Sequence, residues 1–362
     1  MNPQPRLFSE NGISAFPART RTRDARRRVR LRPRGEELET RVVLSTFLVN
    51  TLLDTDAVNL HSGKDASGRI SLRSAIMAAD ALGGANTIKL PSGTIKLTIA
   101  GANEDASATG DLDIKGNLTI QGKGLNSSIV DGNSLDRVFQ VLGGNVTISN
   151  LTIQNGFSSV GGGLLNSGGN VTLSSVVVRD CIAVGADGLN GSAGFGVSPN
   201  VVAGTPIVNN GGNGQDGSGG AGGGIFNAGS MTLTDCTIAF NGALGGLGGR
   251  GLDGANVFGA NGTPSNDQSV ANGEDGVGLN GGSGGAGGSA IGGGVVNATG
   301  AKLTISGTLF SANSVSGGTG GQGGAGGLGQ GGKGADVLNS APDTASVGFS
   351  GAGTGGAGGA GG

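Results

Sequence analysis

Four carboxylates fall within ten residues, and their spacing makes this segment the part of the chain best suited to chemistry. They are Glu104, Asp105, Asp111 and Asp113. Carboxylate oxygens are the ligands that Ca²⁺ prefers, so the segment predicts a candidate calcium site. The alternative is a solvated loop whose Asp side chains accept hydrogen bonds from their own turns. No cofactor other than calcium is predicted.

No catalytic residue is predicted. General acid–base chemistry needs acidic and basic side chains that meet in space. The one histidine, His61, precedes the repeats described below. The acidic residues within the repeats fall at different repeat positions, and they include Asp131, Asp136, Asp180 and Asp235. Trp and Tyr are absent, so the chain lacks a strong aromatic platform for a sugar ring.

Two other patterns have both a chemical and a structural interpretation. Residues 331–338, Gly-Gly-Lys-Gly-Ala-Asp-Val-Leu, match a calcium-binding nonapeptide, but one copy cannot form the stacked half-sites that hold the ion. We prefer to align them with a repeat turn. Cys181 and Cys236 form no CxxC motif, so either a disulfide or two small buried apolar residues remain open.

A short strand that recurs along the chain must position these residues. Its core is an apolar residue, a Thr and a second apolar residue. The five copies start at residues 118, 146, 171, 231 and 303. The first two steps, of 28 and 25 residues, predict one coil of a solenoid each. The steps of 60 and 72 residues require Gly-rich insertions, which lie at about 185–219 and 242–288.

The repeat predicts parallel stacking. The apolar residues of each core point inward and the Thr points outward, so the Thr residues form a row on a sheet face. That row suits a sheet, and an ice-binding hydroxyl array is the alternative. Gly-Gly-Gly-x-x-Asn precedes the core at Gly161–Asn166, Gly222–Asn227 and Gly292–Asn297, with a fourth, weaker copy at Gly334–Asn339. The Asn residues are expected to hydrogen-bond from coil to coil, beside Gly residues with positive φ.

The composition agrees with thin, repeated core layers. Gly numbers 81 of 362 residues, and the 11 Phe are the only aromatic side chains. A coil-by-coil solenoid buries small aliphatic residues without a large aromatic core. The insertions are open to two interpretations, as flexible loops or as ordered layers of polyglycine-II type.

The N-terminal region divides into an Arg-rich leader and a cap. Residues 1–45 carry 11 Arg and 5 acidic residues, which indicates a disordered leader rather than a nucleic-acid-binding arm. Phe47–Val58 is the first expected strand, and Ser71 is the expected N-cap of a helix over Leu72–Leu82 that ends at Gly83. No run reaches the roughly 18 apolar residues of a membrane span. The predicted divisions are 1–45 leader, 46–116 cap and first coils, 117–340 repeats, and 341–362 Gly-rich tail.

Several of these motifs resemble known families. The Gly-Gly-x-x-x-Asn and Phe-x-x-Asn patterns resemble repeats of chlamydial polymorphic outer membrane proteins and related bacterial surface proteins. Residues 72–79 and 110–114 resemble a CSLREA-type domain, although Ile70 replaces its Cys and Ser74 its Glu. Residues 38–45 resemble the LEPR-XLL motif of planctomycete exported proteins, with Thr40 in place of Pro. The insertions are similar to the Gly-rich repeats of mycobacterial PE_PGRS proteins.

Repeats and resemblance together define the expectation. The fold class is all-β, a right-handed parallel β-helix of the pectate-lyase-like solenoid type with a short N-terminal capping helix and Gly-rich insertions. The resemblance implies an extracellular, cell-surface or outer-membrane protein of a bacterium. The expected function is structural or adhesive and non-enzymatic, with a cell-surface or matrix polysaccharide or protein as partner. No nucleic-acid partner is expected. The alternatives are a carbohydrate-active β-helix and a calcium-stabilised surface-layer component.

Overall fold

The computed structural model describes residues 44–195, 209–258, 276–330 and 353–354. All of them belong to one compact unit, Val42–Gly362. The leader up to residue 43, the nonapeptide match at 331–338, the fourth Gly-x-x-x-x-Asn copy and nearly all of the tail lie outside the described residues. In the described part the regular secondary structure is almost all β-strand, and the labelled strands β1 to β26 pair in parallel, which confirms the all-β class.

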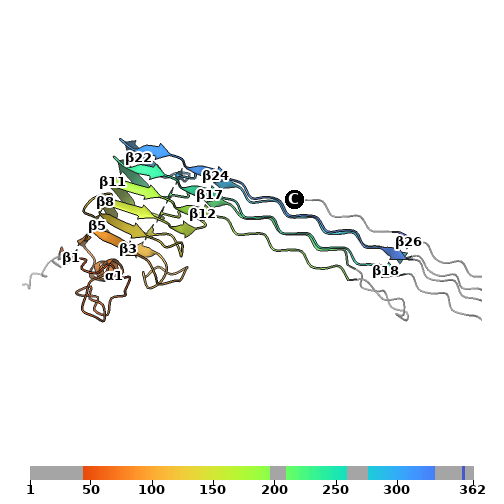
Figure 1. Cartoon of the computed structure of the whole chain (residues 1–362), viewed down its shortest axis with the longest axis horizontal. Coiled ribbons are helices and arrows are strands. Elements are labelled where there is room, and N and C mark those ends of the chain that lie inside the picture. Colours follow the sequence, from red (N-terminus) through yellow and green to blue (C-terminus); the bar gives the residue numbers. More distant parts are fainter. Residues whose placement is uncertain (1–43, 196–208, 259–275, 331–352, 355–362) are drawn as a thin grey trace, which may run out of the picture. The chain divides into compact units, whose positions relative to one another are not determined.

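The largest sheet, here the long sheet, contains eleven strands (Figure 1). Its continuous path runs through seven of them: β1 (Thr46–Leu48), β2 (Ala85–Lys89), β5 (Asn117–Gln121), β8 (Asn145–Gln154), β11 (Asn170–Arg179), β15 (Ser230–Thr234) and β22 (Lys302–Ser306). The other four pair beside this path: β3 (Gly93–Lys96), β6 (Ser128–Asp131), β16 (Thr237–Ala239) and β23 (Leu309–Ser311).

Two smaller sheets accompany the long sheet. The second sheet comprises β4 (Leu112–Ile114), β7 (Phe139–Val141), β10 (Leu164–Asn166), β14 (Ile225–Asn227) and β21 (Val295–Asn297). The third sheet comprises β9 (Phe157–Ser158), β12 (Ile182–Val184), β17 (Gly242–Leu244) and β24 (Ser314–Ser316). From β7 onward the chain visits the second, long and third sheets in that order, and it repeats this circuit up to β24.

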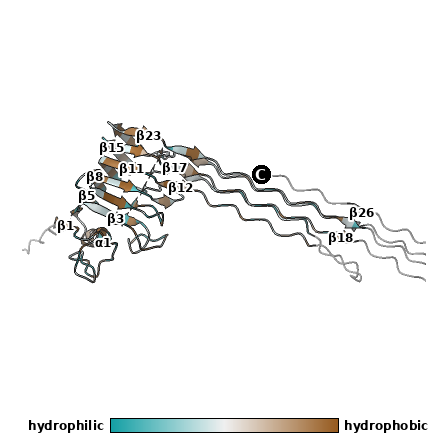
Figure 2. Cartoon of the chain, viewed as in Figure 1, coloured by the Kyte–Doolittle hydropathy of each residue, from teal (hydrophilic) through white to brown (hydrophobic). Residues whose placement is uncertain are grey.

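The five predicted strand cores pair in register. Thr119, Thr147, Thr172, Thr232 and Thr304 are Cα partners in succession, and Thr87 on β2 extends the row. The flanking apolar residues point inward, and those of β5, β8, β11 and β15 are at most 2% exposed. The strands accordingly carry most of the hydrophobic colour in Figure 2. The predicted inward and outward alternation is confirmed for these strands.

Asn residues connect successive strands at three positions, one of which is the predicted Gly-Gly-Gly-x-x-Asn position and one of which runs through Asn117, Asn145 and Asn170. The Nδ2 of Asn166 donates to the Oδ1 of Asn227 at 2.7 Å, and the Nδ2 of Asn227 donates to the Oδ1 of Asn297 at 2.7 Å. A second stack joins Asn241 to Asn313 at 3.0 Å. The first Gly of each Gly-Gly-Gly motif has positive φ, 64° at Gly161, as a tight corner requires.

The N-terminal cap contains the one helix of the described residues, α1 (Leu72–Leu82). Ser71 and Ser74 form a reciprocal capping box, in which each side chain accepts from the other residue's backbone N–H. The helix buries Leu72 and Ile76 against the strands, so its predicted range and N-cap are confirmed. The predicted strand at Phe47–Val58 was too long. It ends at Leu48, and from Asn50 the chain bonds to the backbone of Ile70 rather than to β2.

The Gly-rich insertions are ordered in their described parts. Three segments, the outgoing strands, run at 185–195, 245–258 and 317–330, and two returning strands run at 209–219 and 276–288. Backbone N–H groups donate at every third residue, as from Gly188 and Gly191 to the next outgoing strand. Outgoing strands are parallel to one another and antiparallel to returning strands. A three-residue period is that of a polyproline-II-type helix, which favours the ordered interpretation over flexible loops.

Short segments in or beside these layers form parallel pairs of β-strands. They are β13 (Gly220–Ala221) with β20 (Ala290–Ile291), β18 (Val257–Phe258) with β25 (Gly329–Gln330), and β19 (Gly276–Val277) with β26 (Gly353–Thr354). Both described neighbours of the fourth Gly-x-x-x-x-Asn copy, β25 and β26, therefore pair with glycine-rich strands. The three described copies instead place their Asn residues in the second sheet.

Asp and Asn side chains supplement the backbone bonds of these layers. The Oδ1 of Asp187 accepts from the N–H of Leu247 at 2.8 Å, and that of Asn190 accepts from Arg250 at 2.8 Å. The same bond recurs from strand to strand at Asn210, Asn213, Asp216, Asp253 and Asn256. Acceptors spaced three residues apart thus fix the register of neighbouring strands, since each meets one N–H on the strand above.

Helix α1 covers the core at the N-terminal end of the stack, here called the lower end. At the upper end, the strands β22, β23 and β24 have no further neighbour among the described residues. Ile305 is 47% exposed, although Leu233, its partner on β15, is fully buried. Cys181 and Cys236 are both free and buried, and burial raises the pKa of Cys181 to about 12. They act as small buried residues, the second of the two roles that the sequence left open.

Asn227 is the residue whose loss should cost the Asn stack most. It is fully buried, donates to Asn297 and to the backbone of Lys302, and accepts from Asn166. We expect Asn227→Ala to lower the free energy of unfolding by about 2–3 kcal/mol, because buried partners lose their hydrogen bonds. The exposed Asn297→Ala is the matched control and should cost less than about 1 kcal/mol. Urea unfolding measures both, and equal losses would show that burial of the stack contributes nothing.

Candidate functional site

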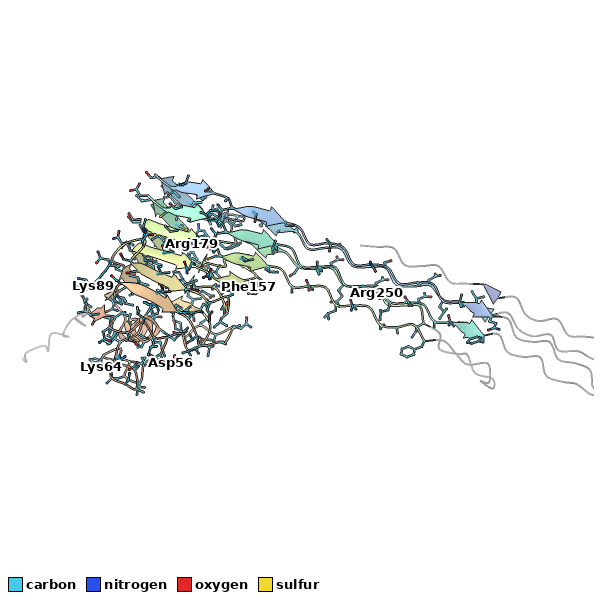
Figure 3. The ribbon with its side chains drawn as sticks, viewed as in Figure 1. Asp56, Lys64, Lys89, Phe157, Arg179 and Arg250 are labelled. Atoms are coloured by element: carbon cyan, nitrogen blue, oxygen red, sulfur yellow. The ribbon has the colours of Figure 1, made fainter. Side chains whose placement is uncertain are left out.

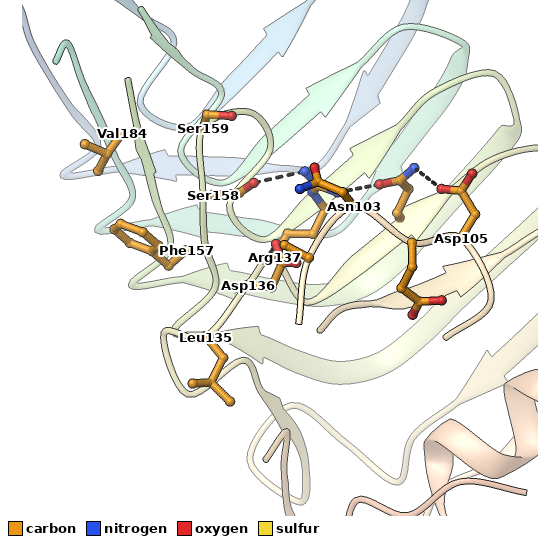
Figure 4. A pocket seen from close by; sticks show the side chains of 12 residues that line it. Asn103, Asp105, Leu135, Asp136, Arg137, Phe157, Ser158, Ser159 and Val184 are labelled. Carbon is orange, nitrogen blue, oxygen red and sulfur yellow. Dashed lines mark hydrogen bonds between the residues drawn. The ribbon is translucent and has the colours of Figure 1, made fainter. Parts of the chain in front are cut away.

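A polar cleft of about 520 Å³ lies between the loop that follows β3 and the strands β7, β9 and β12. Figure 4 shows its side chains. The cleft is lined by Ala102, Asn103, Glu104, Asp105, Leu135, Asp136, Arg137, Gln140, Phe157, Ser158, Ser159 and Val184. A second, smaller hollow of about 260 Å³ lies over the Thr row at Thr172, Thr232 and Thr304.

A buried ion pair holds the loop that lines the cleft. The Nε of Arg73, on α1, lies 2.6 Å from the Oδ1 of Asp54, and both side chains are almost fully buried. The guanidinium also donates to the carbonyls of Ser107, Gly110 and Asp111. Asp54 in turn accepts from the N–H groups of Thr98 and Ile99, at the start of the loop. The helix thereby fixes both ends of the loop through one pair of charges.

The four predicted calcium ligands divide between the cleft and the interior. Glu104 and Asp105 line the cleft, whereas Asp111 and Asp113 are buried at β4. Both carboxylate oxygens of Glu104 accept backbone N–H bonds from its own loop, at 2.8 Å from Ala106 and Thr109. Asp105 makes a long contact of 3.5 Å with Gln140. Glu104 therefore fits the alternative to a calcium site, in which an acidic side chain accepts hydrogen bonds from its own turn.

No group of three or more His, Cys, Asp or Glu in the described part of the chain is arranged to hold a metal ion. One of the four predicted calcium ligands, Asp113, still has an unusual environment. The Oδ2 of Asp113 accepts from Ser107 at 3.0 Å, but its Oδ1 is buried and has no hydrogen-bond partner among the described residues. The calcium site thus remains a prediction.

Arg137 is the residue of the cleft that the sequence motifs did not reveal. It donates to the Oδ2 of Asp111 at 3.1 Å, to the Oγ of Ser158 at 2.9 Å, and to Gln140. These bonds tie β4, β7 and β9 together through one side chain. Arg137 is the sole arginine between residues 74 and 178, and that isolation was the one available signal.

Burial dominates the titration of the acidic residues beside Arg137. Desolvation raises the pKa of Asp111 to about 6, although the charge of Arg137 opposes the change. Desolvation, followed by the charge of Asp111, raises the pKa of Asp113 to about 7. The pKa of Asp136 is also raised by burial. Carboxyl groups with raised pKa beside a cleft are a feature of sites that bind or transfer protons, and also of structural ion-pair networks.

One wall of the cleft is apolar. Leu135 and Phe157 are 39% and 42% exposed, and Val184 completes the wall. In Figure 4 the side chains of Phe157 and Val184 lie on the side away from Asp105. The cleft therefore combines an apolar wall with carboxylates and one guanidinium, which suits binding of a ligand that has both apolar and polar faces.

Two of the other acidic residues named from the sequence have side-chain partners. Asp131 accepts from Gln154 and Asn155 at 2.8 and 2.9 Å, and Asp180 pairs with Arg179 at 3.0 Å. Asp136 alone of that group lines the cleft. His61 lies in an exposed turn whose backbone N–H bonds to Asn59.

None of the described helices is long and apolar enough to cross a membrane. No protein-family model, curated protein or solved structure matches this chain.

The raised pKa of Asp113 predicts that stability falls as pH rises. The folded chain holds this proton more tightly than the unfolded chain, whose carboxyl titrates near 3.8, so the stabilisation is complete below that pH and is lost as pH rises through about 7. We expect Asp113→Asn to flatten the dependence by on the order of 1 kcal/mol between pH 5 and 8. Urea unfolding across that range measures the slope. Asp180→Asn, at an exposed pair, should leave the slope intact, and the idea fails if both variants flatten it equally.

Loss of Arg137 should destabilise the chain far more than loss of Arg179. Arg137→Met removes the ion-pair partner of the buried Asp111 carboxylate, and we expect a cost of about 3 kcal/mol. Arg179→Met breaks a pair whose side chains are both about 40% exposed, so its cost should stay below about 1 kcal/mol. Thermal and urea unfolding compare the two. Equal costs would show that the Arg137 bonds do not hold the cleft together.

Proposed function

We propose that the protein is a right-handed parallel β-helix with a structural or adhesive role outside the cell or on the cell surface. The repeated circuit through three parallel sheets supports the helical architecture. The resemblance of its repeats to bacterial surface proteins supports the location. The proposal assigns no catalytic residue, and it names a surface or matrix polysaccharide or protein as the partner.

The observation that carries this proposal is the regular surface of the glycine-rich layers. Outgoing strands present exposed side chains at every third residue, aligned in rows such as Asp187 with Leu247 and Asn190 with Arg250. Arg250 stands out from its strand in Figure 3. Repeated, aligned side chains on an ordered backbone suit many simultaneous contacts with an extended partner, where avidity replaces strong single contacts.

Charged side chains of the cleft hydrogen-bond to other residues of the chain, and this also supports a role other than catalysis. Both oxygens of Glu104 bond to its own loop, and Arg137 bonds to Asp111, Gln140 and Ser158. A catalytic group must reach the substrate, and these groups are directed at other parts of the chain.

A carbohydrate-active β-helix is the second candidate, and the carboxyls of Asp111, Asp113 and Asp136 favour it. Their pKa values are raised, and glycoside-cleaving sites use one carboxyl in its protonated form. The apolar wall at Phe157 suits the apolar face of a sugar.

The experiment that tests the proposal locates the protein and measures its binding. We expect antibodies against residues 209–258 to label intact cells, and external protease to remove that label. We further expect the purified chain to bind a surface or matrix fraction, and the triple variant Asp187→Ala, Asn190→Ala and Arg250→Ala to bind at least about tenfold more weakly through lost multivalent contacts. Labelling only after lysis would contradict the proposed location.

A panel of polysaccharides separates the two candidates. The structural or adhesive role predicts no new reducing ends and no unsaturated products. Turnover that Asp136→Asn abolishes, while the glycine-layer triple variant retains it, would overturn the first candidate in favour of the second. Asp180→Asn is the matched control, because its carboxylate pairs with Arg179 outside the cleft.

A further inference from the structure

The glycine-rich layers differ at their lower and upper edges, and the glycine positions show why. A Cβ on Gly246 or Gly249 would lie 2.0 Å from a carbonyl oxygen of the outgoing strand beneath it. The same holds one strand higher, where a Cβ on Gly318 would lie 1.9 Å from the oxygen of Gly246. Returning strands obey the same rule at Gly285 and Gly288, each 1.9 Å from an oxygen of the strand beneath. A strand that has Gly at these positions can therefore join from above without such a clash.

The lower edge is closed to a further strand. At the places equivalent to Gly246 and Gly249, the lowest outgoing strand carries Ala186 and Leu189. The lowest returning strand likewise carries Gln215 and Ser218 where the next one has glycine. Side chains occupy the direction from which a lower strand would approach, so the layers can be extended only upward.

A second set of glycines faces the opposite layer. A Cβ on Gly281 would lie 2.2 Å from the oxygen of Gly324, and one on Gly284 would lie 2.0 Å from the oxygen of Gly321. The third position of each triplet is free to carry a side chain, as Asn280 and Ser283 do. A new returning strand with the pattern Gly-Gly-x, and a small or outward-facing residue at x, would thus meet neither clash.

The register of the next returning strand is already set by described residues. Gly353 and Thr354 of β26 pair in parallel with Gly276 and Val277 of β19. Continued along the sequence, this register assigns Gly to every position that faces a neighbouring strand. The residues that follow Thr354 are Gly-Gly-Ala-Gly-Gly-Ala-Gly-Gly, with both Ala at the third position of the triplet.

We propose that the upper edge of the returning strand 276–288 is a docking surface for residues 355–362 of the same chain. Docking adds a third returning strand over the layer, and Gly281 and Gly284 donate their N–H groups to it. Gly211 and Gly214 occupy the equivalent places one strand lower, and they donate to Asn280 and Ser283. The proposal holds whether or not the protein acts at a cell surface.

Hydrogen exchange on the full chain tests this docking. We compare the full chain with a chain that stops after Thr354 and follow the amides of Gly281 and Gly284. Removal of residues 355–362 is expected to speed their exchange at least about tenfold, since each loses its acceptor. Amides of β8 serve as the internal reference and should not change. Identical exchange in the two chains, or faster exchange that extends to β8, would overturn the proposal.

Two matched variants distinguish docking from a general effect of the tail. Gly359→Val places a side chain against the backbone of the strand beneath, and it should reproduce the truncation. Ala360→Val adds similar bulk at the outward position and should leave the exchange of Gly281 and Gly284 at the level of the unmodified chain. Equal behaviour of the two variants, in either direction, would overturn the assigned register.

Discussion

Parallel, in-register stacking is the constraint on which the rest of this structure depends. Neighbouring strands in a sheet lie about 4.8 Å apart, so each residue meets the equivalent residue of the strand above and below. Each side chain must therefore pack or hydrogen-bond with the equivalent side chain on the neighbouring strand. Aliphatic residues satisfy this in the core and Thr satisfies it on the sheet face. Asn satisfies it in the second sheet, where Asn166 donates to Asn227 and Asn227 donates to Asn297.

The same constraint is stricter in the glycine-rich layers. There the strands approach so closely that the Cβ direction of two residues in three points at a neighbouring backbone, as at Gly246 and Gly284. Glycine fits these positions without a clash, but its large loss of conformational entropy on ordering opposes this arrangement. Backbone hydrogen bonds at every third residue offset that loss, and side-chain acceptors such as Asp187 and Asn190 add to them. The exposed third position is left free to vary, which is where a binding specificity can evolve without disturbing the layers.

The stacking of equivalent residues does not determine the structure of the cleft, because the cleft is built from loops that lie outside the repeats. Arg73 and Asp54 fix the loop after β3 from the side of the helix, and Arg137 fixes it from the side of the sheets. Both guanidinium groups combine an ion pair with further hydrogen bonds, which limits the cost of placing charges out of water. Much of the polar chemistry in this region thereby serves to hold the loops in place. The raised pKa values of Asp111 and Asp113 follow from the burial that this requires.

Local signals in the sequence determined the elements of this protein. The capping serines predicted α1, because a capping box needs only residues three apart. The apolar-Thr-apolar cores predicted the strands, their inward face and their pairing. They could do so because parallel stacking requires the same type of residue at the same position of each strand. Tertiary structure alone decided how the long-range polar groups pair. Arg73 meets Asp54 and Arg137 meets Asp111 across loops that have no period, so nothing in their spacing marks them as partners. The glycine-rich layers lie between these cases. Their Gly-x-Asp and Gly-x-Asn triplets are visible in the sequence. Their order, however, depends on hydrogen bonds from these Asp and Asn side chains to segments 60 to 72 residues away, which only the stacked sheets bring together.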